Sequence, residues 1–196
     1  MTQYSAESIL LPLQKMQQAH DEVAHRDILS FDVYTRLKHM VLHFYKYAGK
    51  IEAAREARDQ EALRRTLLDA FIICMASANA INLSVGKDLG ATAESSDLDA
   101  LAHVLAAKVK SRDLFSEATR SLLVIGGPMA KAIESADHME DANPRAAMSA
   151  LVPQMTAAIL ALLGHMQGGI EADVRRRLSE VEEKSIFSGA TPESSH

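Results

Sequence analysis

The chain has 196 residues, of which 47% are hydrophobic and 24% are charged, and this balance excludes disordered, collagen-like and low-complexity proteins. The formal net charge of -5 gives no basic footprint, so we expect no nucleic-acid binding. A single cysteine, Cys74, excludes internal disulfides and a multi-cysteine zinc site, and it fits a reducing compartment. We therefore expect a cytoplasmic globular protein with one domain or two small ones.

No segment of the sequence has the pattern of a membrane or export signal. The first residues, MTQYSAESILLPLQ, lack the basic start, the long apolar core and the cleavage site of a signal peptide. The most apolar stretch, taken as residues 67–83, is interrupted by Asp69, Ser77, Asn79 and Asn82. We therefore expect no membrane partner.

The composition and the spacing of apolar residues predict an all-α fold. Aromatic residues are only 5% and tryptophan is absent, while helix-forming residues dominate. Apolar residues at helical spacing predict a first helix over 5–20, a second from Ser30 or Asp32 to about residue 59, and a third over 60–82. The glycine, serine and acidic residues of 84–97 predict the main loop of the chain.

Three further helices are predicted after this loop. A short one covers 98–110, and a long one covers 113–137 and should be kinked or broken by Gly126-Gly127-Pro128. A third runs from the cap Asn143 to about residue 167, and Pro153 must distort it.

A final amphipathic helix over 168–185 and a disordered tail over 188–196 complete a bundle of about six to seven helices. Long-helix pairs occur on both sides of the central loop, so an internal duplication is one of two open interpretations. It would divide the chain into an N-terminal half, 1–86, and a degenerate C-terminal half, 98–187.

The second predicted helix carries a basic stripe. Within an arc of roughly 60° lie four residues, His39, His43, Lys46 and Lys50. Glu52 and Glu56 lie on nearly the opposite face. The stripe is either a cradle for a phosphate or another anion, with His43, Lys46 and Lys50 as donors, or an ordinary solvated face.

Two histidine groups have spacings that occur in metal sites. His39 and His43 stand four residues apart, but the sequence HMVLH lacks the glutamate of HExxH sites. His20-Asp21 with His25 is similar at first sight to the metal-binding pair of HD phosphohydrolases, but the separate upstream histidine is missing. We therefore predict no metal site at either group.

Asp69 is the strongest single candidate for a catalytic residue. It stands in the apolar segment LLDAFIICMASANAIN, where a carboxylate is costly unless it is paired or bound to a metal. The alternative is a structural ion pair with Arg64, Arg65 or a lysine of the second helix. Asn79 of the same segment either contacts a ligand or caps the helix end.

The run KYAGKIEAAREARD, followed by LLDAFIICMASANAINLSVG, resembles the core of the MazG-like all-α nucleotide pyrophosphohydrolases. The resemblance covers residues 37–86, with a fainter second copy over about 118–174. Asp69 matches the aspartate of the family's ExxD motif, and Asn79 matches the asparagine near the end of its apolar helix. The resemblance implies that the protein binds a nucleotide or another phosphorylated small molecule, hydrolyses it with Mg²⁺, and is built from paired helical subunits.

The sequence departs from the family where the family holds its metal. Lys46, Tyr47 and Lys50 replace the first acidic cluster, and Thr66 replaces the glutamate of ExxD. One aspartate cannot hold Mg²⁺ alone, because the ion needs several oxygen ligands.

Three functions therefore stay open. The first is a divergent pyrophosphohydrolase in which Asp69, Glu52 and Glu56 bind Mg²⁺. The second is a nucleotide-binding relative without turnover, which uses His43, Lys46, Lys50 and Asn79. The third is a helical assembly protein, and a homodimer is consistent with all three.

Overall fold

The computed structural model describes residues 4–89 and 95–183, which form eight α-helices and no named strand. The predicted all-α fold is therefore confirmed. In chain order the helices are α1 (Ala6–Ala24), α2 (Arg26–Leu29), α3 (Val33–Ala57), α4 (Gln60–Ala80), α5 (Leu98–Ala106), α6 (Leu114–Asp137), α7 (Pro144–Leu163) and α8 (Ile170–Glu182). The predicted tail over 188–196 and the middle of the predicted loop lie outside the described residues.

Side-chain caps fix the starts of most of these helices. The side chain of the preceding residue accepts a hydrogen bond from a backbone N–H of the first turn at six helices, with the caps Ser5, Asp32, Asp59, Asp97, Asp113 and Asn143. Each cap satisfies one of the backbone donors that a helix start leaves unpaired. This is why the predicted starts agree with the observed ones to within one or two residues.

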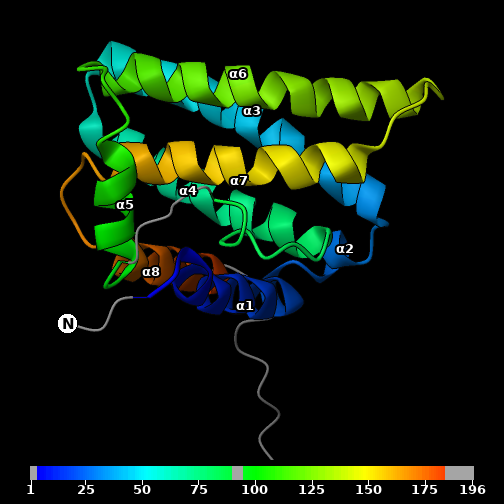
Figure 1. Ribbon diagram of the computed structural model, residues 1–196, viewed down its shortest axis with the longest axis horizontal. Coiled ribbons are helices and arrows are strands. Elements are labelled where there is room, and N and C mark those ends of the chain that lie inside the picture. Colours follow the sequence, from blue (N-terminus) through cyan, green and yellow to red (C-terminus); the bar gives the residue numbers. More distant parts are fainter. Residues whose placement is uncertain (1–3, 90–94, 184–196) are drawn as a thin grey trace, which may run out of the picture.

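The long helices form three layers (Figure 1). One layer contains α3 and α6, the next contains α4 and α7, and the last contains α1 and α8, while α5 stands across one end of the bundle. Buried residues from both halves of the chain belong to one hydrophobic cluster. The α3–α4 pair lies against the α6–α7 pair, and the duplication itself stays a prediction.

Helix α6 runs without a break through Gly126-Gly127-Pro128, so of the two predicted outcomes, a kink or a break, the break is absent. Proline removes one helical hydrogen bond, here to the carbonyl of Val124. The Val124 residue is 58% exposed, so water can solvate the freed carbonyl. Packing of α6 along α3 supplies the remaining stability. Helix α7 is likewise continuous through Pro153.

Helix α7 is long and apolar enough to cross a membrane by length and composition alone. Taking residues 67–83 as the most apolar stretch therefore overlooked a stronger candidate. In this fold α7 packs against α4, α5 and α6, and the core helix of a soluble protein passes the same test. The expectation of no membrane partner stays a prediction.

The end of α7 approaches α5 closely at Gly164. A Cβ atom at this position would collide with the backbone of Ala102. Glycine is required here for space, because its φ of -64° is one that any residue adopts. This contact fixes α5 across the end of the bundle.

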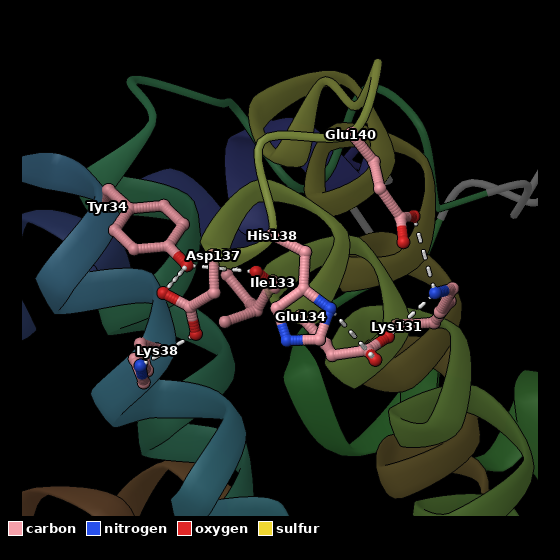
Figure 2. A network of polar contacts seen from close by, with 8 residues as sticks. All are labelled: Tyr34, Lys38, Lys131, Ile133, Glu134, Asp137, His138 and Glu140. Carbon is pink, nitrogen blue, oxygen red and sulfur yellow. Dashed lines mark hydrogen bonds and ion pairs between the residues drawn. The ribbon is translucent and has the colours of Figure 1, made fainter.

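A polar network joins the first turn of α3 to the last turn of α6 (Figure 2). The Tyr34 hydroxyl lies 2.8 Å from the carbonyl oxygen of Ile133 and 2.7 Å from Oδ1 of Asp137. Lys38 Nζ donates to Asp137 Oδ2 at 2.8 Å. Burial, together with the bond to Asp137, raises the pKa of Tyr34 to about 12. The network sets the antiparallel alignment of the two helices.

Candidate functional site

A cavity of about 180 Å³ lies among α1, α3, α4 and α8. Its walls combine apolar side chains such as Ile72, Ile73 and Val181 with a set of polar ones. The polar lining residues are Gln17, His20, Asp21, His25, His39, His43, Tyr47, Asp69 and Arg177. An apolar cavity in which a few polar groups converge is the usual form of a small-molecule site.

Four histidines face this cavity in two pairs. The His20 and His25 rings meet edge-on with centroids 5.4 Å apart at the end of α1. The His39 and His43 rings of α3 have centroids 4.7 Å apart, and their Nε2 atoms are separated by 3.1 Å. The separation of four residues on α3 places the second pair on one helical face, as the sequence predicts.

The contacts of His43 define its tautomer. Lys46 Nζ lies 2.9 Å from His43 Nδ1, and an ammonium group can only donate. Nδ1 therefore accepts, and Nε2 carries the proton that is shared with His39. Burial, with the nearby charge of Lys46, lowers the pKa of His43 to about 4. His43 is therefore neutral at neutral pH.

The two lysines of the basic stripe, Lys46 and Lys50, lie beside the cavity and do not line it. The ammonium groups of Lys46 and Lys50 lie 4.9 and 5.9 Å from the centroid of the Tyr47 ring. Both lysines are exposed. The structure thus brings His43, Lys46 and Lys50 together, with only the histidine among the lining residues.

Asp69 is held by an arginine of the last described helix. Arg177 Nε donates to Asp69 Oδ1 at 2.6 Å, and Arg177 Nη2 lies 3.3 Å from Oδ2. The side chains of Asp69 and Arg177 are 15% and 20% exposed. The alternative of a structural ion pair is what the geometry shows, but its predicted partners were wrong. Arg64 pairs with Asp173 and Arg65 with Glu180.

The three predicted magnesium ligands, Asp69, Glu52 and Glu56, are not brought together. Glu52 accepts hydrogen bonds from Thr119 of α6 at 2.7 Å and from Arg55. Glu56 is exposed on the same helix, and neither glutamate lines the cavity. Across residues 4–89 and 95–183, these acids form no group that could share an ion.

Asn79 links α4 to α1 and has several hydrogen-bond partners. Its Nδ2 donates to the Gln14 carbonyl and to Gln17 Oε1, both at 2.8 Å, and its Oδ1 accepts from Gln14 Nε2 at 3.1 Å. Gln17 lines the cavity, whereas Asn79 does not. Asn79 therefore positions a lining residue, and Asn82, with φ of 55°, terminates the helix.

The group set aside in the sequence, His20, Asp21 and His25, is assembled in the structure. Their potential ligand atoms all lie within 4.8 Å of one another. Burial raises the pKa of Asp21, while a hydrogen bond from Gln17 and the nearby His25 and His20 offset part of this effect.

Two residues that contact lining side chains of the cavity were not predicted, and of these only Arg177 itself lines it. Arg177 pairs with Asp69, and Glu182 Oε1 lies 2.8 Å from His20 Nδ1. The sequence holds a signal for Arg177, which stands three residues after Val174 and four before Val181 on the apolar stripe of the last helix. No comparable pattern marks Glu182.

Comparisons of the chain with protein-family models, with characterised proteins and with solved structures find no match. The resemblance to MazG-like proteins therefore stays a prediction that rests on the residues quoted for it.

Proposed function

We propose that the protein binds a nucleotide or another phosphorylated small molecule at the cavity, as a nucleotide-binding relative of the MazG-like proteins. The observation that carries the proposal is the convergence of four imidazoles and Arg177 in an apolar cavity, next to two lysines that form no ion pair. Among residues 4–89 and 95–183, Lys38, Lys87 and Lys131 form ion pairs, whereas the other lysines, Lys15, Lys46, Lys50, Lys108 and Lys110, form none. Of these, Lys46 and Lys50 stand beside the cavity, next to the lining residue Tyr47. Uncompensated ammonium groups attract phosphate oxygens.

The size of the cavity limits which part of a ligand it holds. About 180 Å³ is below the roughly 300–1,000 Å³ of typical small-molecule sites. A cavity of this volume suits a phosphate group better than a complete nucleotide. The sugar and base would lie outside, along the exposed face that carries Lys46 and Lys50.

The separated carboxylates argue against magnesium-dependent turnover. Mg²⁺ takes oxygen ligands in octahedral geometry, and here Asp69 pairs with Arg177 while Glu52 binds Thr119. We therefore propose ligand binding without pyrophosphate release.

Charge reversal tests the binding proposal. We expect calorimetry in EDTA to detect binding of a member of a panel of nucleoside triphosphates, nucleoside diphosphates and inorganic pyrophosphate. Lys50→Glu should weaken it about tenfold, or about 1.4 kcal/mol, because the ammonium becomes a repelling carboxylate. Lys108→Glu, at an exposed lysine of another helix end, is the matched control and should bind like the wild type.

Three results would contradict this proposal. The first is the absence of binding by every panel member, and the second is an equal loss of affinity in Lys50→Glu and Lys108→Glu. The third is pyrophosphate release with Mg²⁺ that disappears in Asp69→Ala, which would establish the divergent pyrophosphohydrolase instead.

A second candidate function, self-assembly, is favoured by apolar side chains on the α3–α6 layer. Leu42 and Val124 are 62% and 58% exposed, and Tyr45 and Leu123 are also exposed. Such side chains on one layer suit a homodimer interface. Light scattering after size exclusion should give a dimer that Leu42→Glu converts to a monomer, while Val104→Glu on α5 leaves it intact. A monomer at all concentrations would contradict this candidate.

A further inference from the structure

We propose that His20, Asp21 and His25 bind one divalent transition-metal ion of the Zn²⁺ class at the α1 wall of the cavity. The ligand atoms of the three residues all lie within 4.8 Å of one another. Two ligands on one ion, each with a bond of about 2.1 Å, stand roughly 3.0–3.5 Å apart, so small side-chain rotations complete the site. The proposal does not rest on the proposed function, which uses Lys46 and Lys50.

The end of α1 brings the three residues together. On a continuous helix, residues 20, 21 and 25 would be spread over an arc of about 140°. The helix ends at Ala24, and His25 leaves helical geometry with φ of -134° and ψ of 42°. Its backbone N–H donates to the Asp21 carbonyl at 2.9 Å, which fixes this turn. The His25 ring consequently meets the His20 ring edge-on.

His20 has the outer partner that metal-binding histidines usually have. The residue is 5% exposed, and its Nδ1 lies 2.8 Å from Glu182 Oε1. In the neutral ring this contact places the proton on Nδ1 and leaves the Nε2 lone pair for an ion. A carboxylate bonded to the far nitrogen also orients the ring and makes it a stronger ligand.

Asp21 is a buried carboxylate that forms no ion pair with a lysine or arginine of the described residues, and the charge of Arg36 acts on it only from a longer distance. It is 6% exposed, and within the described residues no lysine or arginine lies at ion-pair distance from it. Isolated buried carboxylates are costly, and a coordinated ion is one of the usual ways to compensate them. Glu182 contacts His20 and not Asp21. Asp21 is therefore the one negatively charged ligand of the proposed site, and Glu182 is a second carboxylate that contacts a ligand from outside the site.

The ligand types select the metal. Two imidazole nitrogens and one carboxylate suit Zn²⁺, Co²⁺, Ni²⁺ and Fe²⁺, whereas Mg²⁺ prefers oxygen ligands only. Three protein ligands beside a cavity leave a coordination position for water or for a ligand atom. The site therefore differs in place and in chemistry from the magnesium site that Asp69, Glu52 and Glu56 would form.

A cobalt titration of the tag-free, EDTA-treated full chain tests the proposal. We expect one equivalent of Co²⁺ to bind with visible d–d absorption, Zn²⁺ to displace it, and excess Mg²⁺ to leave it in place. His25→Ala should abolish saturable binding, and Glu182→Gln should weaken it about 10- to 100-fold with unchanged stoichiometry, because Glu182 only orients His20. His138→Ala, at an exposed histidine at the end of α6, is the matched control and should bind like the wild type.

Circular dichroism shows whether each variant is folded, and Asp21→Asn replaces His25→Ala if the latter is not. The proposal is overturned if the wild type binds no Co²⁺ or Zn²⁺, or if His25→Ala and Asp21→Asn bind as the wild type does. Binding that is lost only in His39→Ala would also overturn it, because the ion would then belong to the α3 pair. The nucleotide titration in EDTA contains no free metal, so each proposal can fail without the other.

Discussion

Replacing Phe71 by alanine should lower the free energy of unfolding by about 3–5 kcal/mol, the usual cost of removing a fully buried aromatic side chain. Phe71 lies in α4 and is 0% exposed. α4 packs against α1, α3, α7 and α8, so it contacts helices of all three layers, and a hole in its buried face weakens the shared core. Urea unfolding followed by circular dichroism measures the change.

Phe31→Ala provides the matched control for Phe71→Ala. The same atoms are removed, but Phe31 is 45% exposed just before α3. We expect the free energy of unfolding to fall by less than about 1 kcal/mol, because truncating a half-exposed side chain removes much less buried apolar surface. Similar losses at the two positions would mean that α4 is not the centre of the core.

Removing the Asp69 carboxylate should cost about 1.5–3 kcal/mol of stability, the range for hydrogen bonds to charged groups. Asp69→Ala leaves the Arg177 guanidinium, which is 20% exposed, without its main partner. Chemical unfolding of Asp69→Ala, Arg177→Met and the double variant gives the coupling energy of the pair. We expect the double variant to lose less than the sum of the two single losses.

The exposed pair of Glu171 and Arg175 on α8 is the control for this cycle. Its side chains are 44% and 57% exposed, and the pair has the spacing of adjacent helical turns. Such pairs contribute about 0.3–0.5 kcal/mol, so Glu171→Ala should have a small effect. A coupling energy for Asp69 and Arg177 no larger than that of this pair would contradict a structural role for Asp69.

The fold could be predicted from local signals because those signals are physically strong. The caps Asp32, Asp59 and Asn143 and the apolar period between them fix most helix starts. The four-residue helix α2 was missed because a segment of about one turn is too short to show apolar residues at helical spacing. The uninterrupted course of α6 was missed because packing on α3 and the solvated carbonyl of Val124 override the cost of Pro128, and neither is visible in sequence.

The site was predictable only in part, because it depends on contacts between distant segments. His39 and His43 share a helix, so their pairing follows from spacing alone. Asp69 was found from its apolar surroundings, but its partner Arg177 lies 108 residues away along the chain. His20, Asp21 and His25 were set aside because the separate upstream histidine of the HD phosphohydrolases is missing. The turn at the end of α1 that brings the three side chains together is not visible in their spacing.

Two polar side chains of α8 contact lining residues of the cavity, Arg177 at Asp69 and Glu182 at His20. Displacing this helix would break both contacts at once, which couples the Asp69 side of the cavity to the His20 side. A ligand that holds α8 in place at either end therefore favours binding at the other. If the protein binds both proposed ligands, thermodynamic linkage requires that the factor by which the metal ion tightens phosphate binding equals the factor by which phosphate tightens metal binding.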